Sequence, residues 1–409
     1  MPSYYEFFAG GGMARAGLGP GWTCLFANDI DPKKASAYKQ NWGENDISVK
    51  DVGLLSTQDL PGAAELAWAS FPCQDLSLAG TGAGLKGSRS GTFWPFWHLI
   101  KALNAEGRRP NMVVLENVCG ALTSHDGGDF RSLVDALAVE GYRCGALVID
   151  AALFLPHSRP RLFVIGVRDD IEISDALTAG GPQEPFHSRA LRIAHASLPR
   201  AARTAWIWWK LAAPPRRNRR FAQIIEDAPL DVSWNTPEQT RTLLEMMSPV
   251  NLAKVEKAKR MKRLMVGSLY KRTRVDRDSV RVQRAEVRFD DVAGCLRTPG
   301  GGSSRQSIIV VQGNQIRSRL LSPRETARLM GLPDSYMLPA NYNEAYHLTG
   351  DGVAVPVVRY LAQHIIEPLL RNMQLAVEPA ALNNRRSIVK NSEILWRRIS
   401  ASEKTLSGS

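Results

Sequence analysis

Short apolar runs recur through the first 170 residues, and most of them stop at glycine or a polar residue. They are Tyr4–Phe8, Cys24–Ala27, Leu66–Phe71, Met112–Leu115 and Leu162–Val167. Between them lie stretches with helical spacing, such as Phe130–Val139. Apolar strands that alternate with helices are typical of a parallel α/β sheet. Ligands of such sheets bind beyond the carboxyl ends of the strands, where Asp29, Cys73 and Glu116 are expected.

The pattern becomes basic, irregular and rich in proline from about residue 171. Trp206, Trp208 and Trp209 lie in this stretch, Lys254–Arg263 is a basic helical run, and Arg272–Arg288 alternates like strands. We interpret this stretch as a second, smaller domain.

A more apolar pattern returns after a glycine-rich loop at 298–306. Ser322–Gly331 is predicted to be a helix with Ser322 as N-cap and Pro323 at its first position. Val353–Leu370 is apolar enough to rejoin the first domain as a strand and a helix. We therefore expect the segments 1–175, 176–316, 317–371 and a C-terminal extension at 372–409.

Composition narrows the class of protein. Hydrophobic residues make up 44% and charged residues 22%, as in an ordinary globular protein. The longest apolar runs fall short of the roughly 20 residues that a membrane span needs, and the first residues do not resemble a signal peptide. We expect a cytoplasmic protein without a membrane partner. Five cysteines without CxxC spacing and scattered histidines predict neither a disulfide framework nor a metal site.

The positive charge is concentrated in one region. Phe186–Asp290 contains 23 basic and 10 acidic residues, a net charge of +13, whereas the rest of the chain carries −1. Such a stretch favours a polyanionic partner. A solvated basic surface is the alternative.

The glycine-rich turn of Phe7–Gly19 is the first candidate ligand-binding motif along the chain. Glycines after a strand allow close approach of a ligand to the backbone, and an acid about 20 residues on can hold ribose hydroxyls. Asp29 fits that role, with Asp31 as second choice. A nicotinamide or flavin site, or a purely structural turn, would also explain this pattern.

Three further motifs carry reactive groups. Pro72 precedes Cys73 at a strand end, where a thiolate is favoured, although a buried thiol is the commoner fate of a free cysteine. Glu116 follows an apolar strand, where desolvation would raise its pKa, unless it only caps a helix or forms an ion pair. Arg159 and Arg161 could grip a phosphate or a base oxygen, or form paired surface charges.

Together these motifs resemble the cytosine-5 DNA methyltransferase family. The motifs in order are FAGGG, FPCQ, ENV, SRPR, LSPRETARLMGLPDSY and GDGVAVPVV, which cover 4–170 and about 317–370. The resemblance implies an α/β, Rossmann-like, S-adenosylmethionine-dependent methyltransferase sheet. It also makes the basic stretch a target-recognition domain.

The resemblance also implies roles for individual residues. Cys73 would add to C6 of a cytosine flipped out of duplex DNA, Glu116 would protonate or hydrogen-bond N3, and Arg161 would contact O2, with Arg159 beside it. The cofactor-binding residues would be Phe8, Gly10, Gly11, Gly12, Met13, Asp29, Ile30, Asp51, Val52, Pro72 and Asp351. DNA contacts are expected from Gln74, Ser77, Lys86, Ser88, Arg89, Arg216, Arg217, Arg219 and Arg220.

The chain departs from the family pattern at three places. Asp351 stands where the family has Asn, His157 where it has Gln, and Cys295-Leu296 is the nearest match to a Thr-Leu pair. We expect double-stranded DNA as substrate and a monomeric enzyme. The sequence leaves open whether a cognate restriction endonuclease, acting separately, is paired with it.

Three rival functions would each explain part of this sequence. One is an RNA cytosine-5 methyltransferase of the same fold, whose transfer-RNA branch has Pro-Pro-Cys-Gln and Cys-Phe-Thr signatures that this chain lacks. Another is a non-catalytic DNA-binding relative, which should have lost Cys73, Glu116 or the glycine turn. A flavin or nicotinamide oxidoreductase would explain the glycine turn but neither FPCQ nor ENV.

Overall fold

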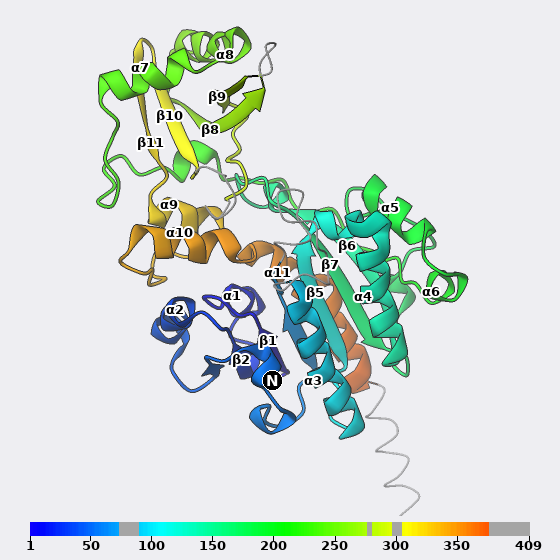
Figure 1. Cartoon of the computed structure of the whole chain (residues 1–409). Helices are drawn as coiled ribbons and strands as arrows, with labels where there is room; N and C mark the ends of the chain where they lie inside the picture. Colours follow the sequence, from blue (N-terminus) through cyan, green and yellow to red (C-terminus); the bar gives the residue numbers. More distant parts are fainter. Residues whose placement is uncertain (73–89, 276–279, 297–304, 376–409) are drawn as a thin grey trace, which may run out of the picture.

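A large lobe and a smaller lobe make up the computed structural model, which describes residues 1–72, 90–275, 280–296 and 305–375 (Figure 1). The large lobe is built on a seven-stranded sheet in the order β3-β2-β1-β4-β5-β7-β6. Its strands are β1 (Ser3–Phe7), β2 (Thr23–Asn28), β3 (Ile47–Ser48), β4 (Leu66–Ala69), β5 (Met112–Val118), β6 (Tyr142–Asp150) and β7 (Pro160–Arg168). The prediction of an α/β sheet is confirmed.

The sheet is parallel except at β7, which pairs antiparallel with both β5 and β6. The apolar run Leu162–Val167 correctly predicted a strand here, but the expectation of a parallel sheet is wrong for this strand. A short connection, residues 151–159, joins β6 to β7. Antiparallel neighbours accept such a short link, whereas parallel neighbours need a longer crossover.

Helices cover both faces of this sheet. They are α1 (Met13–Leu18), α2 (Pro32–Trp42), α3 (Phe93–Ala105), α4 (Gly128–Val139), α5 (Arg189–Ala196) and α6 (Arg200–Thr204), with α10 (Tyr342–Asp351) and α11 (Val355–Leu361) from the C-terminal part. Successive residues of β4 point to opposite faces: Trp68 packs with α11 in one core, and Ala67 and Ala69 pack with α3 in the other. This alternation explains why the central strands are mostly apolar, with Glu6 of β1 and Glu116 of β5 as buried exceptions.

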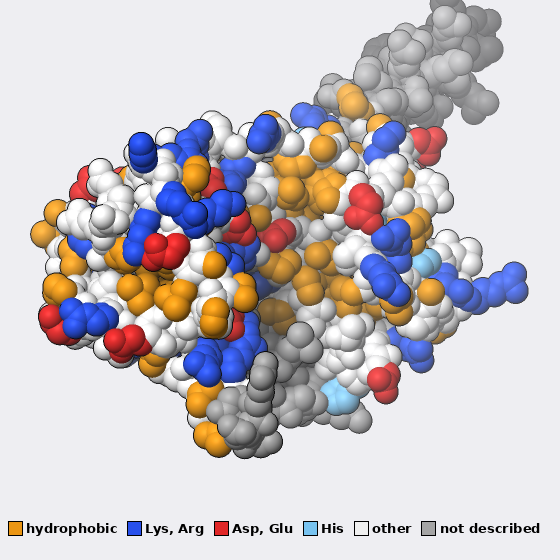
Figure 2. Space-filling model, turned by 90° about the horizontal axis from the view of Figure 1, so that it is seen from above, with side chains coloured by type: hydrophobic (Ala, Val, Ile, Leu, Met, Phe, Trp, Pro, Cys, Tyr) orange, Lys and Arg blue, Asp and Glu red, His pale blue; other side chains and the backbone are white. Residues whose placement is uncertain are grey.

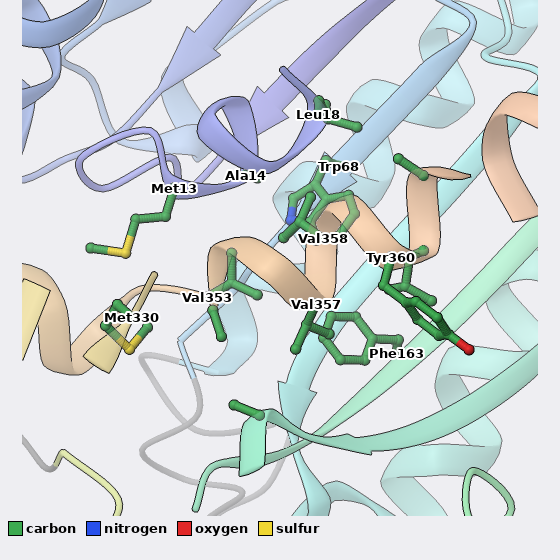
Figure 3. Packing of buried hydrophobic residues seen from close by; sticks show 14 of the residues in the cluster. Met13, Ala14, Leu18, Trp68, Phe163, Met330, Val353, Val357, Val358 and Tyr360 are labelled. Carbon is green, nitrogen blue, oxygen red and sulfur yellow. The ribbon is translucent and has the colours of Figure 1, made fainter. Parts of the chain in front are cut away.

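The C-terminal segment packs tightly against the glycine turn. A Cβ added to Gly17 of α1 would lie 2.3 Å from Cβ of Val358 in α11, so only glycine fits at this crossing. Figure 3 shows Met13 and Leu18 beside Val353 and Val358 in the same core. The strand predicted within Val353–Leu370 is wrong, because the segment is helical from Val355 onward. Its apolar residues recur with helical spacing, and Pro356 suits the first turn of a helix.

One C-terminal helical stretch, Tyr342–Leu375, is apolar and long enough to pass a membrane-span test by composition. Of its most apolar window, 61% is buried inside the structure. Such burial is typical of a helix that belongs to a protein core.

The tryptophans assigned to the second domain lie on the large sheet instead. Ile207 N donates to Cys144 O of β6 at 2.9 Å, which places the Trp206–Trp209 segment along the sheet edge. Trp206 packs edge-on against Phe130 of α4. Local composition cannot reveal this position, because docking of the segment depends on a backbone edge distant in sequence.

The smaller lobe contains a four-stranded antiparallel sheet in the order β11-β10-β8-β9. Its elements are α7 (Pro237–Glu245), α8 (Pro249–Arg260), β8 (Met265–Val275), β9 (Arg281–Arg288), β10 (Ser307–Gln312) and β11 (Gln315–Leu320). The expected boundary at 316/317 falls inside β11. Leu243, Val255, Leu269, Val287 and Ile309 form a separate core between these helices and the sheet.

A buried charge network joins the two lobes where β11 leads into α9 (Pro323–Leu329). Arg319 forms a bidentate pair with Glu325, at 2.6 and 2.7 Å, and both side chains are fully buried. Ser322 caps α9, as predicted, and its amide donates to Glu325 at 2.7 Å. The network fixes where the smaller lobe leaves the large one.

Candidate active site

The glycine turn after β1 forms one wall of the candidate site. Phe8 has a positive φ of 58°, a conformation that non-glycine residues adopt rarely. Gly10 N donates to Asp29 Oδ2 at 2.8 Å, and Asp31 N donates to Asp29 Oδ1 at 2.8 Å. The structure therefore brings together two elements predicted to lie together, the glycine turn and the acid after β2.

The three glycines of the turn have different surroundings. A Cβ on Gly11 would lie 2.3 Å from the Tyr336 hydroxyl, and one on Gly12 would lie 2.3 Å from Nε1 of Trp42. A Cβ on Gly10 would meet nothing within 4 Å. Gly11 and Gly12 thus allow close packing of the scaffold, whereas Gly10 faces open space in which a ligand can approach the backbone.

Residues near this open space have the properties of a nucleoside site. Asp29 is buried, and desolvation raises the pKa of its carboxyl group, although the charge of Lys34 acts against that shift. The neighbouring Ile30 is 63% exposed, an apolar side chain available to cover a ring. Asp51 is exposed and caps a short turn, but Val52 is buried in the core. The sequence grouped Asp51 and Val52 as a pair, and the structure gives them different environments.

Asp351 lies at the end of α10, next to the glycine turn. Its Oδ2 accepts a hydrogen bond from Nζ of Lys34 in α2 at 2.7 Å. A Cβ on the following Gly352 would lie 2.3 Å from Sδ of Met13. Lys34 was not predicted as a site residue, because nothing local in the sequence indicates that α2 and α10 meet.

The base side of the site centres on Glu116, which lies inside β5 rather than after it. Glu116 is buried, and Nε of Arg161 in β7 lies 3.3 Å from its Oε1. Desolvation raises the pKa of Glu116 above its ordinary value, while the Arg161 and Arg159 charges act against the shift. The carboxyl group can therefore retain a proton to higher pH than an exposed glutamate.

Arg159 has a different environment from Arg161. Its guanidinium donates to Gly350 O at 2.8 Å, Gly352 O at 2.6 Å and Leu296 O at 3.3 Å, and the residue is 2% exposed. These contacts join the residue just before β7 to the segment that returns from the smaller lobe and to the end of α10. Arg159 thus holds three parts of the site together through backbone carbonyls.

His157 and Cys295 lie beside this junction. Nδ1 of His157 donates to Leu329 O at 3.0 Å, and Nε2 accepts from Leu296 N at 3.2 Å, an arrangement that requires the neutral ring. Burial would raise the pKa of the Cys295 thiol, but His157 and the charges of Arg159 and Arg161 lower it, and Nη1 of Arg159 lies 3.6 Å from Sγ of Cys295. Two of the three departures from the family pattern, His157 and Cys295-Leu296, therefore contact each other.

The predicted nucleophile, Cys73, lies outside the described residues, as do Gln74, Ser77, Lys86, Ser88 and Arg89. The structure describes the chain up to Pro72, which is half-buried. Asn117 Nδ2 donates to Phe71 O at 3.1 Å, so the backbone that leads to Cys73 is attached to β5 one residue after Glu116.

The four arginines predicted to contact DNA differ in their surroundings. Arg217 forms an ion pair with Asp291 at 3.2 Å and also donates to Asp291 O, with only 17% of its side chain exposed. Arg216, Arg219 and Arg220 are exposed. Figure 2 shows Lys and Arg side chains gathered on the smaller lobe and along the hollow between the lobes. In the part of the chain that the structure describes, no group of three or more acidic, His or Cys side chains could hold a metal.

Comparisons with known proteins agree with this geometry. The model of the family described as C-5 cytosine-specific DNA methylase matches residues 3–367. Type II methyltransferase M.BsuFI of Bacillus subtilis is 25% identical over 371 residues, which cover 90% of this chain and 73% of that protein. Type II methyltransferase M.HhaI of Haemophilus parahaemolyticus is 25% identical over 366 residues, which cover 88% of this chain and 93% of that protein.

Solved structures share the fold. The Entamoeba histolytica methyltransferase EhMeth has a TM-score of 0.56 at 14% identity, covering 90% of this chain and 99% of that one. The Schizosaccharomyces pombe Dnmt2 methyltransferase has a TM-score of 0.52 at 18% identity, with the same two coverages. At these identities the similarity concerns the fold alone.

Proposed function

We propose that this chain, which belongs to the C-5 cytosine-specific DNA methylase family, methylates C5 of a cytosine within a defined sequence of double-stranded DNA. The observation that carries the proposal is the buried pair of Glu116 and Arg161. It combines a carboxyl group of raised pKa with a fixed cation, beside the backbone that leads to Cys73. Such a pair can hold the N3 and O2 edge of cytosine.

Cytosine C5 is a poor nucleophile, so the proposed reaction starts at C6. The Cys73 thiolate forms a bond to C6, while Glu116 donates a proton or hydrogen bond to N3, and C5 becomes enamine-like. Arg161 stabilises the developing charge at O2. Attack from the face of the ring requires the cytosine to leave the duplex.

S-adenosylmethionine, the methyl donor of this family, supplies the methyl group that C5 acquires. A base then removes the C5 proton, the electrons of the C5–H bond form the C5–C6 double bond, and the bond from C6 to Cys73 breaks. N3 returns its proton to Glu116 in the same stage. Arg159 is a positioning residue in this scheme, because its guanidinium binds backbone carbonyls.

The described residues fit this cofactor. Gly10 leaves open space at the backbone, the Asp29 carboxylate is fixed by two amides, and the exposed Ile30 offers an apolar surface. We assign Phe8, Gly10, Asp29, Ile30, Asp51, Pro72 and Asp351 to direct cofactor contact. Gly11, Gly12, Met13 and Val52 support the site, since their surroundings are scaffold atoms.

The proposed target-recognition domain is the smaller lobe with its basic surface. Its sheet and helices have their own core, and the buried network at α9 holds them to the catalytic lobe.

We propose a monomeric enzyme of the bacterial cytoplasm that serves in restriction-modification or DNA marking, because curated relatives are Type II methyltransferases. A cognate endonuclease would act as a separate protein. The RNA alternative has less support, because the matching family model describes DNA methylases.

A covalent trap tests the reaction. DNA of random sequence is first methylated, and the modified sites identify the recognised sequence. A duplex with 5-fluorocytosine at that target should then trap the enzyme when S-adenosylmethionine is present, because fluorine cannot leave C5 as a proton does. The adduct should map to the peptide that contains Cys73, and Cys73→Ser should abolish it. An active enzyme that forms no adduct would contradict addition at C6.

A further inference from the structure

Lys34 lies among three carboxylates at the edge of the glycine turn. Its Nζ is 2.7 Å from Asp351 Oδ2, and 22% of its side chain is exposed. Burial alone would lower the pKa of Lys34, but the charges of Asp351, Asp29 and Asp31 raise it. The ammonium group therefore stays protonated between the end of α10 and the start of α2.

The same cluster adjoins the open space of the candidate cofactor site. Asp29 accepts the amide hydrogen of Gly10, where a Cβ would meet nothing within 4 Å. Asp351 immediately precedes Gly352, which packs on Met13 of the glycine turn. The charges of this cluster consequently act on a ligand that lies along the turn.

Arg159 also acts on Asp351, so two cations and three carboxylates contribute to the field at this edge. Removing the charge of Asp351 or of Lys34 therefore changes that field by one unit charge, in opposite directions. S-adenosylmethionine carries a sulfonium, and S-adenosylhomocysteine, which remains after methyl transfer, carries a neutral thioether in its place. The two ligands therefore differ by one positive charge and one methyl group. A local negative field stabilises the sulfonium form selectively, and the ion pair with Lys34 weakens that field.

We propose that Asp351 and Lys34 set the preference of the cofactor site for S-adenosylmethionine over S-adenosylhomocysteine. Asp351 strengthens the preference, and Lys34 moderates it by neutralising that carboxylate. The inference rests on the proposed function, because it takes the glycine turn as the cofactor site. Asp351, which stands where the family has Asn, would thus strengthen the binding of S-adenosylmethionine relative to S-adenosylhomocysteine.

A neighbouring ion pair provides a matched control. Lys33 Nζ lies 2.8 Å from Glu344 Oε1, so it also joins α2 to α10. Its side chain is 65% exposed, and its pKa is raised mainly by Glu344, with a smaller contribution from Asp31. Loss of this pair should loosen the same two helices and change the field at the glycine turn much less, because solvent screens the exposed Lys33.

The test is calorimetric titration of the full chain with each of the two ligands, free of DNA. The measured quantity is the dissociation constant of S-adenosylhomocysteine divided by that of S-adenosylmethionine. Asp351→Asn should lower this ratio by about fivefold, and Lys34→Gln should raise it by about fivefold. Lys33→Gln should leave it within about twofold.

Each outcome decides between the alternatives. Unchanged ratios in Asp351→Asn and Lys34→Gln, with intact S-adenosylmethionine binding, would overturn this inference and leave the proposed function standing. An equal shift in Lys33→Gln would also overturn it, because helix docking would then be the cause. If one of the two site variants fails to fold, the other still decides, since they shift the ratio in opposite directions. Absence of binding by the native chain would remove both proposals.

Discussion

Nε of Arg161 lies 3.3 Å from Oε1 of Glu116, and both side chains are largely withdrawn from solvent. The two residues come from adjacent antiparallel strands, with Val118 of β5 opposite Arg161 of β7. This register places a permanent cation beside a carboxyl group whose pKa is raised by desolvation. A carboxyl group in this environment can donate a proton while a charge develops next to it.

Replacement of this carboxyl group should slow chemistry rather than binding. Glu116→Gln should reduce the rate of methyl transfer by about 10²–10⁴-fold, because an amide cannot transfer a proton to N3. Since the protonated form is the active one, the native rate should fall as pH rises through the raised pKa of Glu116. The Gln variant should lack that fall. Single-turnover rates from acid to neutral pH check this, with S-adenosylmethionine affinity as the control.

DNA affinity should depend on only part of the arginine cluster. Replacing Arg216, Arg219 and Arg220 together by Gln should weaken binding to all sequences and flatten its salt dependence. The slope of log K against log salt should fall by about 0.9 for each lost phosphate contact. Arg217→Gln should leave the slope unchanged, because Arg217 pairs with Asp291. Binding titrations at several salt concentrations distinguish the two variants, and equal slopes for the triple variant and native chain would exclude this cluster from the DNA footprint.

The junction between the lobes should be a major source of stability. Glu325→Ala leaves the buried Arg319 without its carboxylate and should cost about 3–5 kcal/mol. Asp334→Ala removes the comparable but exposed pair with Arg328 and should cost less than about 1 kcal/mol. Urea denaturation of both variants gives the comparison. A similar loss of unfolding free energy in the two variants would show that burial does not make the Arg319–Glu325 pair more important for stability than the exposed pair.

Glu6 should make the protein less stable as pH rises. It is fully buried in β1, and desolvation raises its pKa from 4.5 to about 8. An acid with a raised folded pKa favours the folded state at low pH, and this contribution is lost between the unfolded and folded pKa values. Glu6→Gln should therefore remove a slope of about 1.4 kcal/mol per pH unit between pH 4.5 and 8. The measurement is the free energy of unfolding of the native chain and of Glu6→Gln across this pH range. Equal slopes for the two proteins would show that Glu6 does not titrate there.

Local pattern alone determined much of this molecule. Strands that are buried on both faces of a sheet consist mainly of apolar residues, so β1, β2, β4, β5 and β7 could be predicted from apolar runs. Ser322 and Pro323 marked the start of α9, because an N-cap and a first-turn proline act within a few residues. The order of motifs indicated the family, and the charge of Phe186–Asp290 indicated a basic region.

Tertiary structure decided the features that depend on long-range contacts. Lys34 and Asp351 are 317 positions apart, and only the packing of α2 against α10 makes them an ion pair. Strand direction at β7 and the docking of Trp206 on the large sheet follow from backbone edges that a local pattern does not encode. Arg217 resembles Arg216 in sequence, yet Asp291 engages only the former in an ion pair among the described residues. The type and spacing of neighbouring residues indicate which secondary structure a segment forms. The contact partner of a side chain depends on how the whole chain folds.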